Sequence, residues 1–222
     1  MLKIHVFFKQ LFCLLALAAM LTAANPAAAE NKMLDGDYTY DILRNGTQIG
    51  TYSFHVTNRD DMSTTVQATM NIEAKVLFLT AYKADHQRVE EYLNGALQKI
   101  HGEAKFNGKD YAFTYDAKLD QVDRNGEIEQ LKYPVVTLSP FKPRNTEGKF
   151  IGLSEKGKTH EAYFEDNGIV KKKSGIKLHP FHELAFIGDV RRDLWYTPEG
   201  ILDSLSYDKD GATITFKRRA KN

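Results

Sequence analysis

Cysteine is almost absent from this chain of 222 residues: Cys13 is the only one. It lies in an apolar run, residues 11–21, that we expect to be removed from the mature protein. The remaining chain would then have no disulfide, no cysteine-liganded zinc and no cysteine nucleophile. A domain of this size without disulfides must be stabilised by its own hydrophobic core.

An excess of charge of one sign is also missing. Lys plus Arg total 30 and Asp plus Glu total 29, so the formal net charge is +1. This balance excludes the strongly basic surface of a nucleic-acid-binding protein, and we expect no nucleic-acid partner. The sequence has no phosphate-binding glycine loop, no dinucleotide turn and no Gly-x-Ser-x-Gly elbow. We therefore expect no cofactor, and nothing indicates an enzyme.

The N-terminal segment has the pattern of a secretory signal peptide. Lys3 and Lys9 precede the apolar run 11–21, and small residues follow as far as Ala29. A basic start, an apolar run of about 7–15 residues and a small-x-small end predict cleavage after Ala29. The alternative is a retained anchor, but a spanning helix needs about 20 apolar residues. We predict a signal peptide at 1–29, a single β domain at 30–222 without a transmembrane segment, and a periplasmic or secreted location.

The mature chain alternates apolar and polar residues with a period of two, as at 66–76 and 111–119. This period is typical of strands with one buried face. Seven turn signals, mostly Asn-Gly pairs such as Asn45-Gly46 and Asn167-Gly168, separate the runs. The predicted fold class is all-β: an antiparallel meander forming a strongly curved sheet or partly open barrel of about ten strands. Residues 83–93 fit either a short helix or a strand, and the flanking β pattern favours the strand.

Three blocks carry a resemblance to a known family. They are an aromatic-alternating hairpin at 37–50, a turn at 90–97, and an Asp-Leu-Trp-Tyr hairpin at 193–202. Together they resemble an uncharacterised bacterial family of exported all-β proteins, a domain of unknown function. The resemblance implies a curved antiparallel sheet or open barrel, and it implies no activity and no catalytic residues.

The first functional hypothesis is a non-enzymatic protein that binds a lipid-like or other apolar ligand in a concave sheet. The candidate ligand-binding residues are apolar or aromatic: Met70, Ile72, Tyr92, Tyr111, Phe113 and Trp195. Trp195 fits a core anchor as well as a ligand contact. The row of His86, Arg88 and Glu90 could orient a polar group, but we favour a solvated face with cross-strand ion pairs.

Two other hypotheses stay open. An envelope assembly or maintenance factor would bind another envelope protein, with the proline-rich connection at 134–148 and the lysines at 171–173 as contact candidates. Those lysines also fit a contact with anionic lipid or, as we favour, the protection of an edge strand. A metal-assisted hydrolase would use His179, His182 and Glu183, although the spacing is not that of a zincin helix.

Overall fold

The computed structural model describes residues 33–76, 79–174 and 177–220. The predicted signal peptide at 1–29, its cleavage site at Ala29 and Cys13 lie outside the described residues, so export stays a prediction. Within the described ranges, all regular secondary structure is β-strand, and no helix long and apolar enough to cross a bilayer occurs there.

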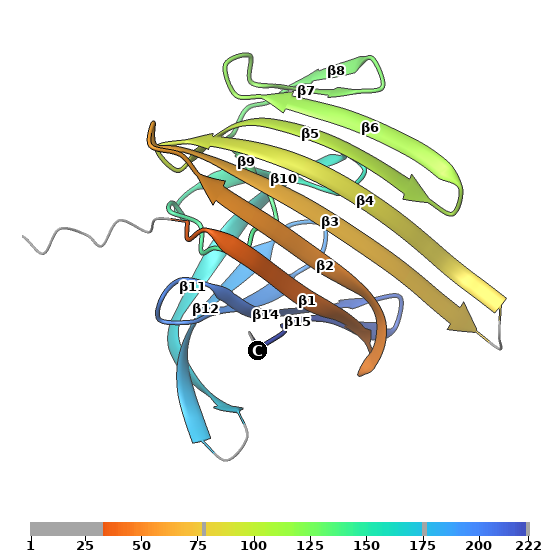
Figure 1. Cartoon of the computed structure of the whole chain (residues 1–222), viewed down its shortest axis with the longest axis vertical. Coiled ribbons are helices and arrows are strands. Elements are labelled where there is room, and N and C mark those ends of the chain that lie inside the picture. Colours follow the sequence, from red (N-terminus) through yellow and green to blue (C-terminus); the bar gives the residue numbers. More distant parts are fainter. Residues whose placement is uncertain (1–32, 77–78, 175–176, 221–222) are drawn as a thin grey trace, which may run out of the picture. The chain divides into compact units, whose positions relative to one another are not determined.

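The part of the chain that the structure describes forms fifteen strands (Figure 1). In chain order they are β1 (Gly36–Arg44), β2 (Thr47–Asn58), β3 (Ser63–Val76), β4 (Leu79–Leu93), β5 (Ala96–Phe106), β6 (Lys109–Asp116), β7 (Gln121–Arg124), β8 (Glu127–Gln130), β9 (Val135–Val136), β10 (Lys149–Leu153), β11 (Thr159–Ser174), β12 (Lys177–Ile187), β13 (Arg192–Tyr196), β14 (Leu202–Lys209) and β15 (Ala212–Arg218).

All fifteen strands belong to one open sheet in the order β8-β7-β6-β5-β4-β3-β2-β1-β15-β14-β13-β12-β11-β10-β9. The predicted antiparallel meander is confirmed: sequence neighbours pair antiparallel, and β1 pairs with β15. Among the strands of the described residues, only β9 and β10 pair parallel. The strand number exceeds the predicted ten because β7 to β10 are short strands of two to five residues, with little alternation to reveal them.

The Asn-Gly signals mark real hairpin turns with one exception. At Asn45-Gly46 both residues have positive φ, 48° and 82°, which a two-residue hairpin turn requires. Asn167-Gly168 is different: β11 runs through it, and the register with β12 shifts between Asp166 and Gly168. The positive φ of Gly168, 73°, therefore serves a β-bulge in place of the predicted turn.

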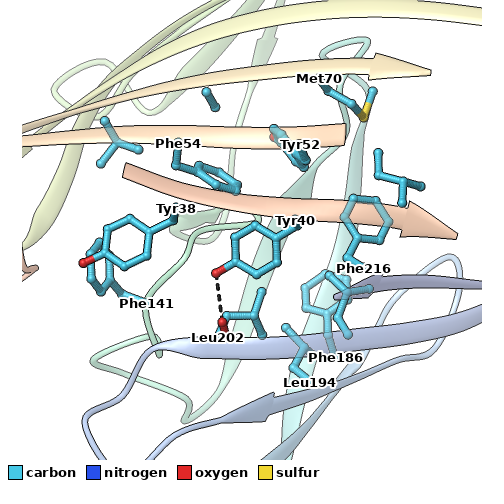
Figure 2. Packing of buried hydrophobic residues seen from close by; sticks show 14 of the residues in the cluster. Tyr38, Tyr40, Tyr52, Phe54, Met70, Phe141, Phe186, Leu194, Leu202 and Phe216 are labelled. Atoms are coloured by element: carbon cyan, nitrogen blue, oxygen red, sulfur yellow. Dashed lines mark hydrogen bonds between the residues drawn. The ribbon is translucent and has the colours of Figure 1, made fainter. Parts of the chain in front are cut away.

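The ambiguous stretch at 83–93 is a strand, part of β4. Its even-numbered residues pair with buried positions of β3, so the sheet has one apolar face along its length. On that face Tyr40 donates a hydrogen bond to the carbonyl of Leu202 at 2.9 Å, and the rings of Tyr52 and Phe54 lie 4.5 Å apart (Figure 2). This main core cluster joins β1 to β5 with β11 to β15.

A second core cluster connects the two ends of the open sheet. Side chains of β5, β6 and β7 pack there against side chains of β9 and β10; the members are Ile100, Phe113, Tyr115, Val122, Val135, Ile151 and Leu153. Thr159 of β11 also donates a hydrogen bond to Glu129 of β8 at 2.6 Å. The sheet thus closes on itself through side chains, while its end strands β8 and β9 are not neighbours in the hydrogen-bonded order.

A matched pair of β2 variants tests whether the core lies on one face of the sheet. Phe54→Ala removes a ring that is 2% exposed and should lower the free energy of unfolding by about 3–5 kcal/mol. Ser53→Ala, on the opposite face, removes a hydroxyl contact with Thr39 at 3.3 Å and should lower it by about 1 kcal/mol or less. Urea unfolding followed by circular dichroism measures both; similar losses for the two variants would contradict a one-sided core.

Candidate functional site

A row of polar side chains on β4 lies inside the core. His86, Arg88 and Glu90 are 1%, 3% and 0% exposed, and they pair across the ladder with Met70, Ala68 and Val66 of β3. The favoured interpretation of this row as a solvated face is therefore wrong. Alternation placed the three residues on one face correctly, but that face is the concave, apolar one.

The charges in this row are paired with each other. Arg88 Nε lies 2.7 Å from Glu90 Oε1, in an ion pair whose angle is too bent for a hydrogen bond. Tyr92 donates to Glu90 Oε2 at 2.7 Å, and Arg88 Nη2 donates to the carbonyl of Leu138 at 2.7 Å. Burial and the charge of Glu90 raise the pKa of Tyr92 well above its ordinary value, so its phenol stays protonated. Such pairing is what allows two charges to remain buried.

The imidazole of His86 is not satisfied in this way. Its two ring nitrogens are buried and have no hydrogen-bond partner among the described residues, whereas the nearby Tyr52 hydroxyl has Arg88 as a neighbour. The two rings are 6.5 Å apart on the concave face. Burial and the neighbouring Arg88 lower the pKa of His86 to about 3, so the imidazole is neutral and offers one donor and one acceptor. Unsatisfied buried groups cost about 1–3 kcal/mol each and call for a partner.

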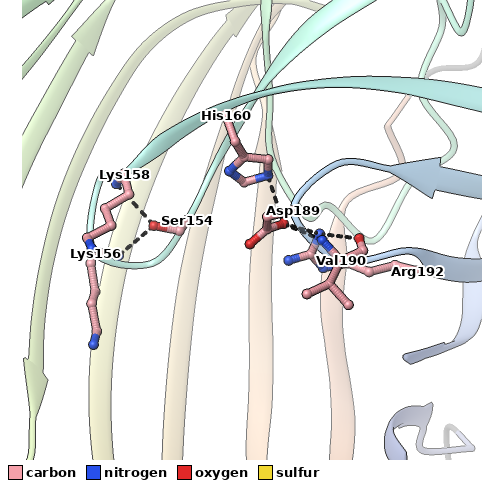
Figure 3. A network of polar contacts seen from close by, with 7 residues as sticks. All are labelled: Ser154, Lys156, Lys158, His160, Asp189, Val190 and Arg192. Atoms are coloured by element: carbon pink, nitrogen blue, oxygen red, sulfur yellow. Dashed lines mark hydrogen bonds and ion pairs between the residues drawn. The ribbon is translucent and has the colours of Figure 1, made fainter. Parts of the chain in front are cut away.

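The loop between β10 and β11 brings charge to the same face. Ser154 Oγ accepts hydrogen bonds from the backbone N–H groups of Lys156 and Lys158 (Figure 3), and this turn places Lys156 Nζ 4.4 Å from the ring centre of Phe106. Gly157 has φ of 72°, and a Cβ there would lie 2.5 Å from the Cβ of Phe113. Glycine therefore lets the loop press against β6.

Glu155 of this loop acts on several tyrosines of the concave face. Burial is the larger cause, and the Glu155 charge a further one, of the raised pKa of Tyr82 and Tyr52. The same two causes raise the pKa of Tyr207 to about 12. These tyrosines belong to β2, β4 and β14, so the Glu155 charge influences residues of strands that lie far apart in the chain.

The concave face has one covered end and one open end. At the covered end the connection between β9 and β10 folds over it: Phe141 packs on Tyr38 with ring centres 5.3 Å apart, and Leu138 joins the main core cluster. At the other end, which we call the open end, inward-facing side chains are only partly buried. They are Ile72, Tyr82, Tyr111, Tyr207 and Ile214.

A polar network borders the open end (Figure 3). Asp189 lies 3.1 Å from Arg192 and 3.2 Å from His160, and the Arg192 guanidinium lies 5.6 Å from the ring centre of Tyr207. Burial lowers the pKa of His160, although the Asp189 carboxylate opposes the shift. The open end thus combines apolar and aromatic walls with both signs of charge.

The six predicted ligand-binding residues divide into three groups. Ile72 and Tyr111 lie at the open end, whereas Met70, Tyr92 and Phe113 are buried in the two core clusters. Trp195 faces the outer surface, where its indole donates to Glu183 at 2.8 Å and Lys172 Nζ lies 3.3 Å from a ring centre. The sequence did not reveal Tyr82, Tyr207 or Glu155, because their proximity depends on strands far apart in the chain.

The candidate metal ligands are separated by the alternation of β12. His182 contacts Asp166 at 2.6 Å and Lys142 at 3.0 Å, while Glu183, on the opposite face, accepts hydrogen bonds from Trp195 and Asn167. His179 is exposed on the face of Glu183. Over the described ranges, no group of three His, Cys, Asp or Glu side chains is placed to hold a metal ion.

A hollow of about 420 Å³ is lined mainly by residues of β4, β5 and β6, and another of about 350 Å³ by residues of β2, β3 and β4. Much of their lining comes from outward-facing polar side chains such as Gln87, Glu103 and Asn71. They offer no continuous apolar wall, and we place the candidate site on the concave face instead.

The fold and this arrangement define an all-β, barrel-like sheet protein. Residues 40–219 match the family described as Domain of unknown function (DUF6134), and the chain belongs to that family. The predicted membership of an all-β family of unknown function is thereby confirmed. A similar solved structure is the crystal structure of a beta-barrel-like protein of Domain of Unknown Function DUF1849 from Brucella abortus. Its TM-score is 0.57 at 6% identity, over 82% of this chain and 94% of that chain, so the likeness concerns the fold alone. No curated protein matches the chain.

The buried His86 predicts a pH dependence of stability. Its folded-state pKa of about 3 lies below the ordinary value of about 6.5, so its contribution is complete above pH 6.5 and is lost as the pH falls. We expect His86 alone to lower the free energy of unfolding by about 2 kcal/mol between pH 7.5 and pH 5. Urea unfolding at both pH values should show a smaller loss for His86→Leu than for the wild type. The exposed control His179→Gln should keep the wild-type loss; an unchanged loss in His86→Leu would contradict the assignment.

Proposed function

We propose that this protein is exported to the bacterial envelope and binds an apolar or amphipathic small molecule, such as a single-chain lipid, at the open end. The observation that carries the proposal is the partial exposure of apolar and aromatic side chains that face inward. Ile72, Tyr82 and Tyr207 point to the concave side of a curved sheet and yet keep contact with solvent. Apolar walls with a few convergent polar groups are the usual features of a small-molecule site.

The polar groups support a ligand with a polar head. The unsatisfied His86 imidazole and the Tyr52 hydroxyl lie deeper on the same face, and the Glu155 charge contributes to the raised pKa of Tyr52. A hydroxyl or a secondary amide, which both donates and accepts hydrogen bonds, would satisfy the uncharged imidazole. An apolar chain would then cover Ile72 and the tyrosines. This binding requires no catalytic step, and the N-terminal pattern of residues 1–29 supports a place outside the cytoplasm.

The alternative, an assembly factor that binds another envelope protein, has less support at its first contact candidate. The connection at 134–148 is folded onto the sheet, where Lys142 N donates to the carbonyl of Gly200 and Leu202 N to that of Pro140. Its apolar residues therefore cover the concave face and do not present a free surface. The second candidate, the lysines at 171–173, belongs to β11.

Ligand binding can be tested with two neighbouring β3 variants. Ile72→Lys places a charge at the open end and should weaken uptake of the lipophilic dye N-phenyl-1-naphthylamine by about tenfold or more, since an apolar contact is replaced by an ammonium group. Asn71→Lys carries the same charge on the outer face and should bind as the wild type does.

Native mass spectrometry of protein purified from the periplasm, without detergent, is the companion measurement. We expect a bound small molecule in the wild type and in Asn71→Lys, and its loss in Ile72→Lys. Similar urea midpoints for the two variants ensure that the comparison concerns binding and not folding. Wild-type protein that carries no molecule and takes up no dye would refute the proposal.

A further inference from the structure

Part of the β11–β12 hairpin extends beyond its neighbouring strands. β10 pairs with β11 only at Thr159 to Tyr163, and β13 pairs with β12 only from His182 onward. Residues 168–173 of β11 are therefore paired only with β12, and residues 178–181 of β12 only with β11; we call these two stretches the ribbon. Figure 1 shows it, in cyan, reaching past the ends of the adjacent strands. A two-stranded ribbon has two faces and two free edges.

One face of the ribbon is open and has both apolar and cationic side chains. Lys171 pairs with Pro180, and Lys173 pairs with Leu178, so these residues share a face with Ile169. Ile169 and Leu178 are 68% and 65% exposed. The open face thus alternates isolated apolar side chains with lysines.

The opposite face is partly covered. Phe181 is only 9% exposed, and Lys172 lies over the Trp195 ring at 3.3 Å. Burial lowers the pKa of Lys172, which agrees with this partial cover, although Asp203 and Glu183 oppose the shift. The two faces therefore differ in chemistry, and the open face is the more accessible of the two.

The charge of the hairpin is strongly one-sided. Residues 168–182 contain four lysines and two histidines and no acidic residue. The nearest acids lie at the base of the ribbon and are engaged: Asp166 contacts His182 at 2.6 Å, and Glu183 accepts from Trp195. The open face consequently has positive charge that no acid of the hairpin neutralises.

We propose that the open face of the ribbon docks onto the surface of a bilayer that contains anionic phospholipid. Lys171 and Lys173 would contact lipid phosphates, while Ile169 and Leu178 would insert at the level of the headgroups. Long lysine side chains can keep their ammonium groups at this level while their stems cover apolar surface. The small and scattered apolar area fits shallow insertion better than the larger continuous core of a protein interface.

The sequence favours protection of a free strand edge as the role of the lysines at 171–173. This role explains the lysines only in part. Lysines on unpaired edges do hinder association of sheets. That role does not account for Ile169 and Leu178, which are exposed on the same face as Lys171 and Lys173 and would favour association if no surface received them.

Vesicle sedimentation with the whole mature chain tests the proposal. The wild type should bind vesicles of phosphatidylcholine with about 30% phosphatidylglycerol more strongly than pure phosphatidylcholine, and about 0.5 M salt should weaken the binding. Lys171→Glu/Lys173→Glu should reduce binding by about tenfold or more. Lys118→Glu/Lys132→Glu, which makes the same charge change at exposed lysines elsewhere, should bind nearly as the wild type does. Ile169→Ser/Leu178→Ser should weaken binding while keeping its salt dependence.

Three results would overturn the proposal. The first is equal binding of the wild type to neutral and anionic vesicles. The second is an equal loss in the two charge-reversed variants, which would indicate net charge alone. The third is a ribbon variant that aggregates without vesicles yet binds them unchanged, which would assign the lysines to edge protection. None of these results depends on ligand uptake at the open end, so the two proposals can fail separately.

Discussion

The constraint on which this structure depends is that a sheet with one apolar face must cover that face. No helix packs on it within the described residues, so the sheet has to supply its own cover by curving. The second core cluster shows how this succeeds without a closed ladder: Phe113 and Val122 from one end of the strand order pack against Ile151 from the other. Side-chain packing replaces backbone hydrogen bonds at this junction, and the end strands stay short, which limits their exposure as pairing edges.

Because the apolar face is covered, the polar row of His86, Arg88 and Glu90 on β4 is buried with it. Burial of these polar groups costs free energy, which hydrogen bonds and charge pairing with neighbouring groups must offset. Arg88 and Glu90 are paired in the core, and each has a second partner: the carbonyl of Leu138 for Arg88 and the hydroxyl of Tyr92 for Glu90. A buried ion pair contributes little net stability, but removing one partner leaves an unpaired charge in a poorly polarisable interior. The pair is therefore better understood as fixing the position of the connection that contains Leu138 than as strengthening the sheet.

Local signals in the sequence were enough to predict the strands but not the site. The turn at Asn45-Gly46 follows from two positive φ angles that the residues themselves favour. Asn167-Gly168 has the same sequence pattern, but β11 pairs with β12 on both sides of it, so these residues form a β-bulge and not a turn. Alternation assigns His86 and Trp195 to faces of their strands, yet it cannot say which face becomes concave. The open end could not be predicted for the same reason. The Glu155 charge contributes to the raised pKa of both Tyr82 on β4 and Tyr207 on β14, and this depends on how the sheet curves.

The difference between the two ends of the concave face has its origin in the prolines of the connection. Proline lacks the N–H that a central strand needs, so residues 134–148, with Pro134, Pro140 and Pro143, form no more than the two-residue β9 and one isolated bridge, Phe141 to Ile201. A segment of this length that cannot join a ladder still has apolar residues to bury, and Leu138 and Phe141 do so on the concave face. The same backbone supplies the carbonyl that Arg88 requires, so cover and charge pair support each other. Access to the apolar face from solvent is thereby left to the opposite end, where Ile72, Tyr82 and Ile214 stay only partly buried among the described residues.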